Sequence, residues 1–137
     1  MDRQSINPVA WGRHFSMDQA VLVRGAECTL RCAGQTSIVD DPTAELGLSV
    51  EGAGDMRKQI EGALANIDCV LDEAGLERSD IVMVRFFPTD MAAFFDHYDV
   101  YAAWIGAAGI TPPQSTLGVA CLALPELMIE IEVVAAI

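Results

Sequence analysis

The C-terminal part of the chain alternates strictly between apolar and acidic positions. Ile129, Ile131 and Val133 fall on one side of an extended segment, whereas Glu130 and Glu132 fall on the other, because side chains switch faces at every residue of a strand. The apolar side indicates contact with a core. The acidic side indicates contact with water, a partner or a polar cleft, so the two carboxylates are the first candidates for a functional site.

Two helices are predicted by apolar positions that recur every three or four residues. The first covers residues 55–74, with Asp55 as its N-cap and Gly75 at the C-terminal position that favours a left-handed backbone. The second begins at Thr89 or Asp90 and runs to about residue 107. Its apolar stripe is rich in aromatic residues, namely Phe94, Tyr98, Tyr101 and Ile105. A stripe of this kind usually packs into a core.

Shorter apolar runs predict the strands. Residues 1–19 lack clear periodicity and indicate an extended N-terminal segment. Residues 20–24 and 28–33, separated by a turn, predict a hairpin. Residues 40–54 are rich in Asp, Glu, Pro and Gly and predict a surface loop. The other strands are expected at residues 37–39 and 80–87, and on both sides of a break at Pro125.

This order of elements predicts one α+β domain over residues 1–137. It is a two-layer sandwich in which two helices cover one face of a mixed sheet, since helices that connect parallel strands pack on the sheet. The other face carries Glu130 and Glu132 among apolar side chains. A half-apolar sheet face without a covering layer usually meets a partner, so we expect a homo-oligomer.

Composition narrows the function classes. The formal net charge is −12, and the eight Lys and Arg residues are scattered, which disfavours nucleic acids and anionic membranes as partners. No run approaches the roughly 20 apolar residues of a membrane helix, and no apolar stretch follows a basic start. We therefore expect a soluble, cytoplasmic protein. Four cysteines without a C-x-x-C pair, and two histidines, give little support for a metal or cofactor site, and free thiols are expected.

Several motifs together resemble the Rid family of enamine/imine deaminases, formerly described as endoribonucleases. They are Ala33-Gly34-Gln35, Gln59 and Asn66 in the first predicted helix, Ala74-Gly75-Leu76 followed by Asp80-Ile81-Val82, and Leu124-Pro125 leading to Ile129-Glu130-Ile131-Glu132. The resemblance covers about residues 18–136. It implies a chorismate-mutase-like fold and a homotrimer with ligand clefts between subunits. It also implies hydrolysis of enamines and imines to ketones and ammonia.

The resemblance also implies site residues. Glu130 corresponds to the glutamate that positions or activates water. Gln114 stands where active members have an arginine that binds the substrate carboxylate. Ala33, beside Gly34, stands where they have a serine, Thr116 where a cysteine is common, and Phe15 where a tyrosine is expected. Because a glutamine carries no charge, the chain resembles a divergent subgroup that prefers a neutral or less acidic ligand.

Two further residues complete the candidate substrate-binding set. Arg85 interrupts an otherwise apolar strand, and Tyr98 belongs to the aromatic stripe of the second predicted helix. A structural alternative exists for the charged groups: Glu130 or Glu132 pairs with Arg85 or Arg31 across the sheet or between subunits. For Tyr98 the alternative is a place in the core.

Three functions are compatible with these residues. The first is a hydrolase or deaminase in which Glu130 orients water while Gln114 and Thr116 hold a carbonyl or amide. The second is a non-catalytic trimer that binds a small molecule or a protein. The third is chemistry such as tautomerisation on a neutral intermediate. Ribonuclease activity is the least favoured, because the chain lacks a basic face.

Overall fold

The centre of the fold is a four-stranded mixed sheet. The computed structural model describes the backbone of residues 1–137 and every side chain except that of Arg13. The strand order is β3-β8-β6-β7, with bounds Thr29–Arg31, Ile129–Ala136, Ile81–Pro88 and Gln114–Thr116, respectively. Strand β8 runs antiparallel to β3 and β6, whereas β7 runs parallel to β6. The predicted mixed sheet is therefore confirmed.

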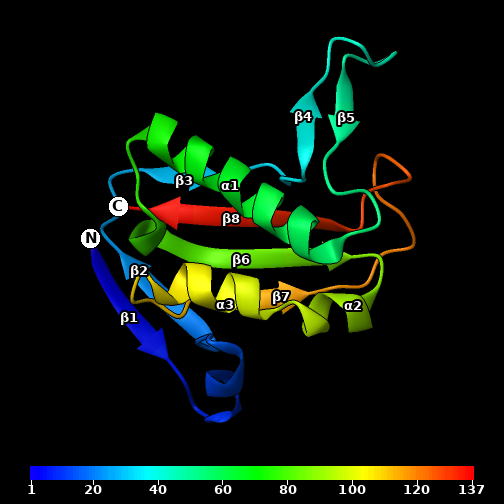
Figure 1. Ribbon diagram of the computed structural model, residues 1–137. Coiled ribbons are helices and arrows are strands. Elements are labelled where there is room, and N and C mark those ends of the chain that lie inside the picture. Colours follow the sequence, from blue (N-terminus) through cyan, green and yellow to red (C-terminus); the bar gives the residue numbers. More distant parts are fainter.

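Three helices cover one face of this sheet: α1 (Met56–Ala74), α2 (Met91–Asp96) and α3 (Asp99–Gly106) (Figure 1). The core lies between the two layers, and its largest fully buried side chains include Phe86, Phe94 and Tyr101. This arrangement confirms the predicted α+β sandwich. None of the helices in the described chain combines the length and the apolarity that crossing a membrane requires.

Helix α1 has the caps that its sequence predicts. The Asp55 side chain accepts a hydrogen bond from the backbone N–H of Lys58, and Gly75 has a φ of 70° at the C-terminus. The Gly75 N–H donates to Asp72 O and the Leu76 N–H donates to Leu71 O, the paired bonds of a Schellman motif. Leu76 is buried and closes the apolar stripe of the helix.

The second predicted helix is interrupted. Helix α2 ends at Asp96, because its C-cap His97 leaves the helical region with a φ of −120° and a ψ of 15°, and α3 begins at Asp99. The break lies next to Tyr98, whose hydroxyl donates to the backbone oxygen of Phe15. The prediction of one continuous helix to residue 107 was therefore wrong, because two helices occupy this range. Contacts with the distant N-terminal segment accompany the break, and helical periodicity carries no information about them.

The N-terminal region pairs differently from the prediction. Strand β1 (Asp2–Ile6) pairs antiparallel with β2 (Ala20–Arg24), while β3 pairs with the end of β8. The predicted hairpin of residues 20–33 is therefore wrong. The β1–β2 ribbon is fixed to the body by Arg3, which donates to Ser79 O at 2.9 Å and to Ile81 O at 2.7 Å. These partners are nearly eighty positions away in sequence, so local patterns could not indicate them.

The predicted loop of residues 40–54 contains a strand. Strands β4 (Ile38–Asp40) and β5 (Leu48–Val50) form a hairpin that projects from the body at the end of the sheet (Figure 1). Below it, the buried amide of Gln59 donates to Gly52 O and Glu126 O and accepts from the Met128 N–H. This side chain joins α1 to the segment that leads into β8, so Gln59 stabilises the frame around the candidate site.

The other face of the sheet has no covering layer in the chain. Register pairs Arg85 with Glu132 and Phe87 with Glu130, so these four side chains point away from the helices. Ile129, Ile131 and Val133 point into the core and are almost fully buried. The predicted division of the last strand into an apolar and an acidic face is confirmed.

Candidate functional site

The Glu130 carboxylate lies on the open face of the sheet beside Gly34. Residues 32–35 continue the pairing along β8: the Cys32 N–H donates to Val133 O, and Gln35 exchanges both backbone hydrogen bonds with Ile131. Gly34 thereby faces Glu130 so closely that a Cβ on Gly34 would overlap the carboxylate and lie 2.6 Å from its Cγ. A glycine at this position gives the Glu130 side chain its space. Ala33 precedes it and is exposed.

Two glutamates of β8 have different partners. Arg85 Nη1 lies 3.4 Å from Glu132 Oε2, and both side chains are partly exposed. Among the side chains that the structure describes, Glu130 has no ion pair and no hydrogen-bond partner. Of the two structural pairings considered for Arg85, the chain itself therefore forms the one with Glu132. Glu130 stays available for another role.

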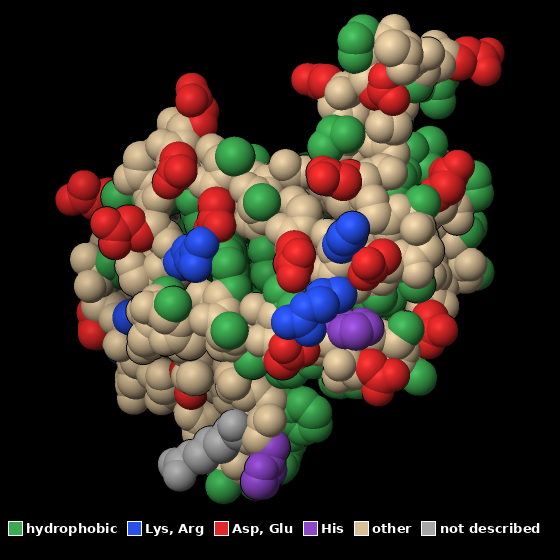
Figure 2. All heavy atoms as spheres, viewed as in Figure 1, with side chains coloured by type: hydrophobic (Ala, Val, Ile, Leu, Met, Phe, Trp, Pro, Cys, Tyr) green, Lys and Arg blue, Asp and Glu red, His purple; other side chains and the backbone are tan. Residues whose placement is uncertain are grey.

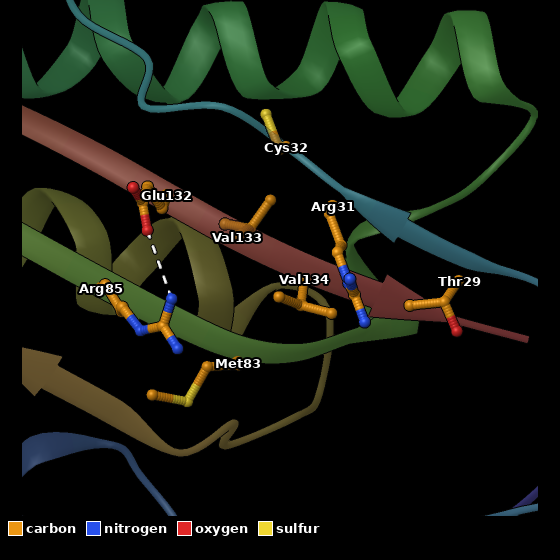
Figure 3. Close-up of a pocket in the computed structure, with 8 residues that line it drawn as sticks. All are labelled: Thr29, Arg31, Cys32, Met83, Arg85, Glu132, Val133 and Val134. Atoms are coloured by element: carbon orange, nitrogen blue, oxygen red, sulfur yellow. Dashed lines mark hydrogen bonds and ion pairs between the residues drawn. The ribbon is translucent and has the colours of Figure 1, made fainter.

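Arg85 belongs to a shallow hollow on the open face (Figure 3). Arg31 extends into the same region from β3, and Met83 lies below Arg85 on β6.

Cys32 also lines this hollow. Burial is the main cause that raises the pKa of its thiol; a hydrogen bond with Gln35 lowers the pKa in part, and the negative charge of Glu132 raises it further. A thiol that stays protonated is a poor nucleophile, so Cys32 is not a candidate for covalent catalysis.

The other candidate residues gather at the β7 edge of the sheet. Gln114 and Thr116 are in register with Val84 and Phe86, which point into the core, so they lie on the helix side of the sheet. Gln114, Thr116, Phe15 and Tyr98 line one pocket of about 180 Å³, which we call the edge pocket. The structure therefore brings together four of the predicted binding residues.

Three further residues line the edge pocket: Trp11, Met17 and Phe95. Trp11 and Phe15 belong to a short 3₁₀ helix, η1 (Trp11–Phe15), and Phe95 belongs to α2. The sequence carried one signal for them, because Trp11 and Phe15 are large apolar residues in a segment without periodicity. It gave no reason to place that segment beside α2, since more than 75 positions separate the two segments.

A compact hydrogen-bond cluster fixes Gln114. Its Nε2 donates to Phe15 O at 2.6 Å, and the same nitrogen lies 2.6 Å from the Tyr98 hydroxyl. The Tyr98 hydroxyl also reaches Phe15 O at 2.5 Å. Burial raises the pKa of Tyr98, and the hydrogen bond with Gln114 only partly offsets that effect. Tyr98 therefore stays a neutral phenol, and Gln114 is held in one orientation against the N-terminal segment.

The candidate residues thus form two groups on opposite faces of the sheet. Glu130, with Gly34 and Ala33, lies on the open face with Arg85, whereas Gln114, Thr116, Phe15 and Tyr98 lie on the helix side. Strand β6 stands between β8 and β7. Neither group alone combines the carboxylate with the pocket, so one chain holds two halves of the predicted site.

Acidic side chains dominate the helix-covered side of the molecule (Figure 2). They are spread over α1 and the β4–β5 hairpin, and the basic side chains among them are few. Two of these basic residues are paired: Arg57 bonds to Asp99, and Arg78 makes a bidentate hydrogen bond to Asp68 at 2.7 and 2.6 Å. No group of three or more His, Cys, Asp or Glu among the described side chains could hold a metal ion.

Comparisons with known proteins agree on one family. The profile of the endoribonuclease L-PSP family matches residues 16–137. A RutC family protein of Aquifex aeolicus is 35% identical over 117 residues, 85% of each chain. The solved structure of YyfB, a Rid-family protein of Yersinia pestis, is 33% identical, with the whole of both chains covered and a TM-score of 0.78. The YjgF gene product of E. coli is 27% identical over 95% of this chain and 92% of that chain, with a TM-score of 0.64.

Proposed function

The chain belongs to the Rid (endoribonuclease L-PSP) family, whose chorismate-mutase-like fold it has, and we propose that it hydrolyses a small reactive imine or enamine. An enamine first moves a proton from nitrogen to carbon and becomes the imine. Water then adds to the carbon of the C=N bond, and the resulting carbinolamine loses ammonia to leave a ketone or aldehyde. The chain would supply a carboxylate to orient the water and a pocket to hold the substrate.

The position of Glu130 carries this proposal. Its carboxylate lies on an open face, over a glycine that leaves it room, and the neighbouring Glu132 takes the nearby Arg85. A carboxylate in this situation can accept a proton from water without first breaking an internal ion pair. The structural alternative, in which the arginine binds Glu130, loses support within one chain.

The division of the candidate residues supports a site made by two copies. The open face carries Glu130 without a covering layer, and the edge pocket with Gln114 opens on the helix side of the sheet. Association of copies, as the expected homotrimer, would bring the open face of one chain to the edge pocket of its neighbour. The two halves then form one cleft.

Binding without catalysis is the second candidate function. The Gln114 amide nitrogen already bonds to Phe15 O and lies 2.6 Å from the Tyr98 hydroxyl. A pocket whose main polar group serves the fold is suited to holding a ligand by its apolar walls. In that case Glu130 contributes to assembly, and the trimer binds a small molecule that it does not convert.

Ammonia release from freshly generated 2-iminobutanoate and from a neutral ketimine tests the proposed function. Glu130→Gln should lower kcat at least 100-fold, in the range that a general acid–base group contributes. Glu132→Gln is the matched control on the same strand and should retain more than a third of the rate. Sedimentation of both variants shows whether assembly is unchanged. No release above background on either substrate, or equal loss in the two variants with loss of assembly, would favour the binding module.

A further inference from the structure

We propose that the edge pocket takes a neutral, flat, ring-bearing ligand, and that the preferred substrate therefore carries an aromatic or unsaturated ring and no carboxylate beside its C=N bond. The proposal names the substrate class of the function proposed above, and it depends on that function only in treating the edge pocket as the substrate site.

The walls of the edge pocket are aromatic rings set at steep angles. Phe15 lies 6.4 Å from Trp11 and 6.3 Å from Phe95 between ring centroids, with interplanar angles of 77° and 61°. The Phe95 and Tyr98 rings are 5.9 Å apart. Edge-to-face contact is the preferred geometry between aromatic rings, so a further flat ring in this pocket would find faces and edges on several sides.

Three of the aromatic rings that line the edge pocket remain largely exposed, although they pack against one another. Trp11 is 53% exposed, Phe95 44% and Phe15 39%. They come from two segments far apart in sequence, yet they meet around one hollow. Contiguous exposed aromatic side chains mark binding surfaces more often than single exposed ones do. The exposed rings therefore offer a ligand an aromatic surface, which it would share with the face of a neighbouring copy.

The polar groups of the edge pocket are neutral. Among the described side chains that line it, the polar groups are the Gln114 amide, the hydroxyls of Thr116 and Tyr98 and the Trp11 indole N–H, and none carries a charge. Gln114 Oε1 lies 3.0 Å from the Tyr98 hydroxyl, which has a single proton to donate. When that proton goes to Phe15 O, Gln114 Oε1 can accept from a donor on the ligand. The Thr116 hydroxyl can donate or accept. An amide or imine edge matches this pair, whereas a carboxylate would lose its hydration without gaining a cation.

The size of the pocket agrees with one ring. Its volume is about 180 Å³, close to the roughly 150 Å³ of an apolar cavity that holds benzene. A larger apolar group would extend past Trp11 into solvent or onto a neighbouring copy. The occupant that fits is therefore a single flat ring with a short polar substituent.

Calorimetric titration with benzamide, benzoate and cyclohexanecarboxamide tests the proposal. Benzamide and benzoate share a ring and differ in charge, and the third probe keeps the amide but loses the flat ring. We expect benzamide to bind at least 10-fold more tightly than each of the others. Phe95→Ala should weaken benzamide binding at least 10-fold, whereas Met91→Ala, which removes an exposed apolar side chain of the same helix outside the pocket, should leave it unchanged. Gln114→Arg should reverse the preference towards benzoate.

Benzoate binding at or above the strength of benzamide would overturn the proposal, as would equal binding of the non-aromatic amide, failure of all three probes, or benzamide binding that Phe95→Ala does not change. These readouts need no turnover, so they can be made whether or not the protein is an enzyme. Selective benzamide binding by a protein without hydrolytic activity would reject the proposed function and leave the ligand class standing. Hydrolysis of carboxylated imines alone would support the proposed function and reject the ligand class.

Discussion

The Glu130 carboxylate occupies the space that any side chain at position 34 would need. A Cβ on Gly34 would overlap the carboxylate group, and the atoms in its way are the far end of a flexible side chain. Gly34 has a backbone φ in the range that other residues adopt, since its φ is not among the positive values. Position 34 therefore controls where Glu130 points, without a conformational requirement for glycine.

Gly34→Ala should consequently separate function from stability. The variant should fold with a free energy of unfolding within about 1 kcal/mol of the wild type, because the backbone tolerates alanine and Glu130 can rotate away. Hydrolysis should fall roughly 100-fold, the cost expected when a catalytic group moves by about 1 Å. The rate of ammonia release and the urea midpoint measure the two effects.

Gly106→Ala is the control for that substitution. Gly106 ends α3 with nothing within 4 Å of an added Cβ, so alanine should leave the rate unchanged and keep or raise stability. If Gly34→Ala retained the wild-type rate with an intact fold, Glu130 would not be the group that orients water.

Tyr101→Phe should stabilise the protein. The Tyr101 hydroxyl is buried, and no described group donates to it or accepts from it. Removing an unsatisfied buried hydroxyl should raise the free energy of unfolding by about 1 kcal/mol. Chemical denaturation at neutral pH measures this change.

Tyr98→Phe is the matched variant in the same aromatic cluster. Its hydroxyl bonds to Phe15 O and contacts Gln114, so its loss should lower the free energy of unfolding by about 1–2 kcal/mol. A loss of stability in Tyr101→Phe as large as that in Tyr98→Phe would mean that the Tyr101 hydroxyl has a hydrogen-bond partner.

The two tyrosines also predict a loss of stability at alkaline pH. Burial raises the pKa of both Tyr98 and Tyr101 above the ordinary value of 10.0. Above about pH 10 the unfolded state loses phenolic protons that the folded state retains, so stability is fully present below that pH and falls as the pH rises. Denaturation midpoints between pH 8 and pH 11 should fall less steeply in Tyr101→Phe than in the wild type. Parallel curves for the two proteins would contradict the assignment.

Gln59→Leu should strongly destabilise the fold. The substitution keeps the buried volume but leaves Gly52 O, Glu126 O and the Met128 N–H without their partner. We expect a loss of about 3 kcal/mol in the free energy of unfolding, the cost of buried backbone groups left unpaired. Glu61→Ala, on the exposed side of the same helix, should change it by less than about 0.5 kcal/mol. Similar losses in the two variants would show that the hydrogen bonds of Gln59 do not contribute more to the free energy of unfolding than an exposed side chain does.

Part of the candidate site could be predicted from local sequence. The alternation around Glu130 placed its side chain opposite the core. The sequence allowed several pairings of Arg85 and did not single out Glu132, because the register of two strands that are nearly fifty positions apart decides it. The aromatic wall of the edge pocket was missed, since it joins the N-terminal segment to α2.

The sequence by itself determined the elements whose signals are local: α1 with its caps, the buried strand β6 and the two faces of β8. Helical periodicity, capping chemistry and alternation act within a few residues, so they can be recognised in one chain. Only the tertiary structure decided that β1 pairs with β2, that the second helix breaks beside Tyr98, and that Gln114 and Glu130 lie on opposite faces of the sheet. These features depend on long-range contacts, whose partners are set by packing of the whole chain.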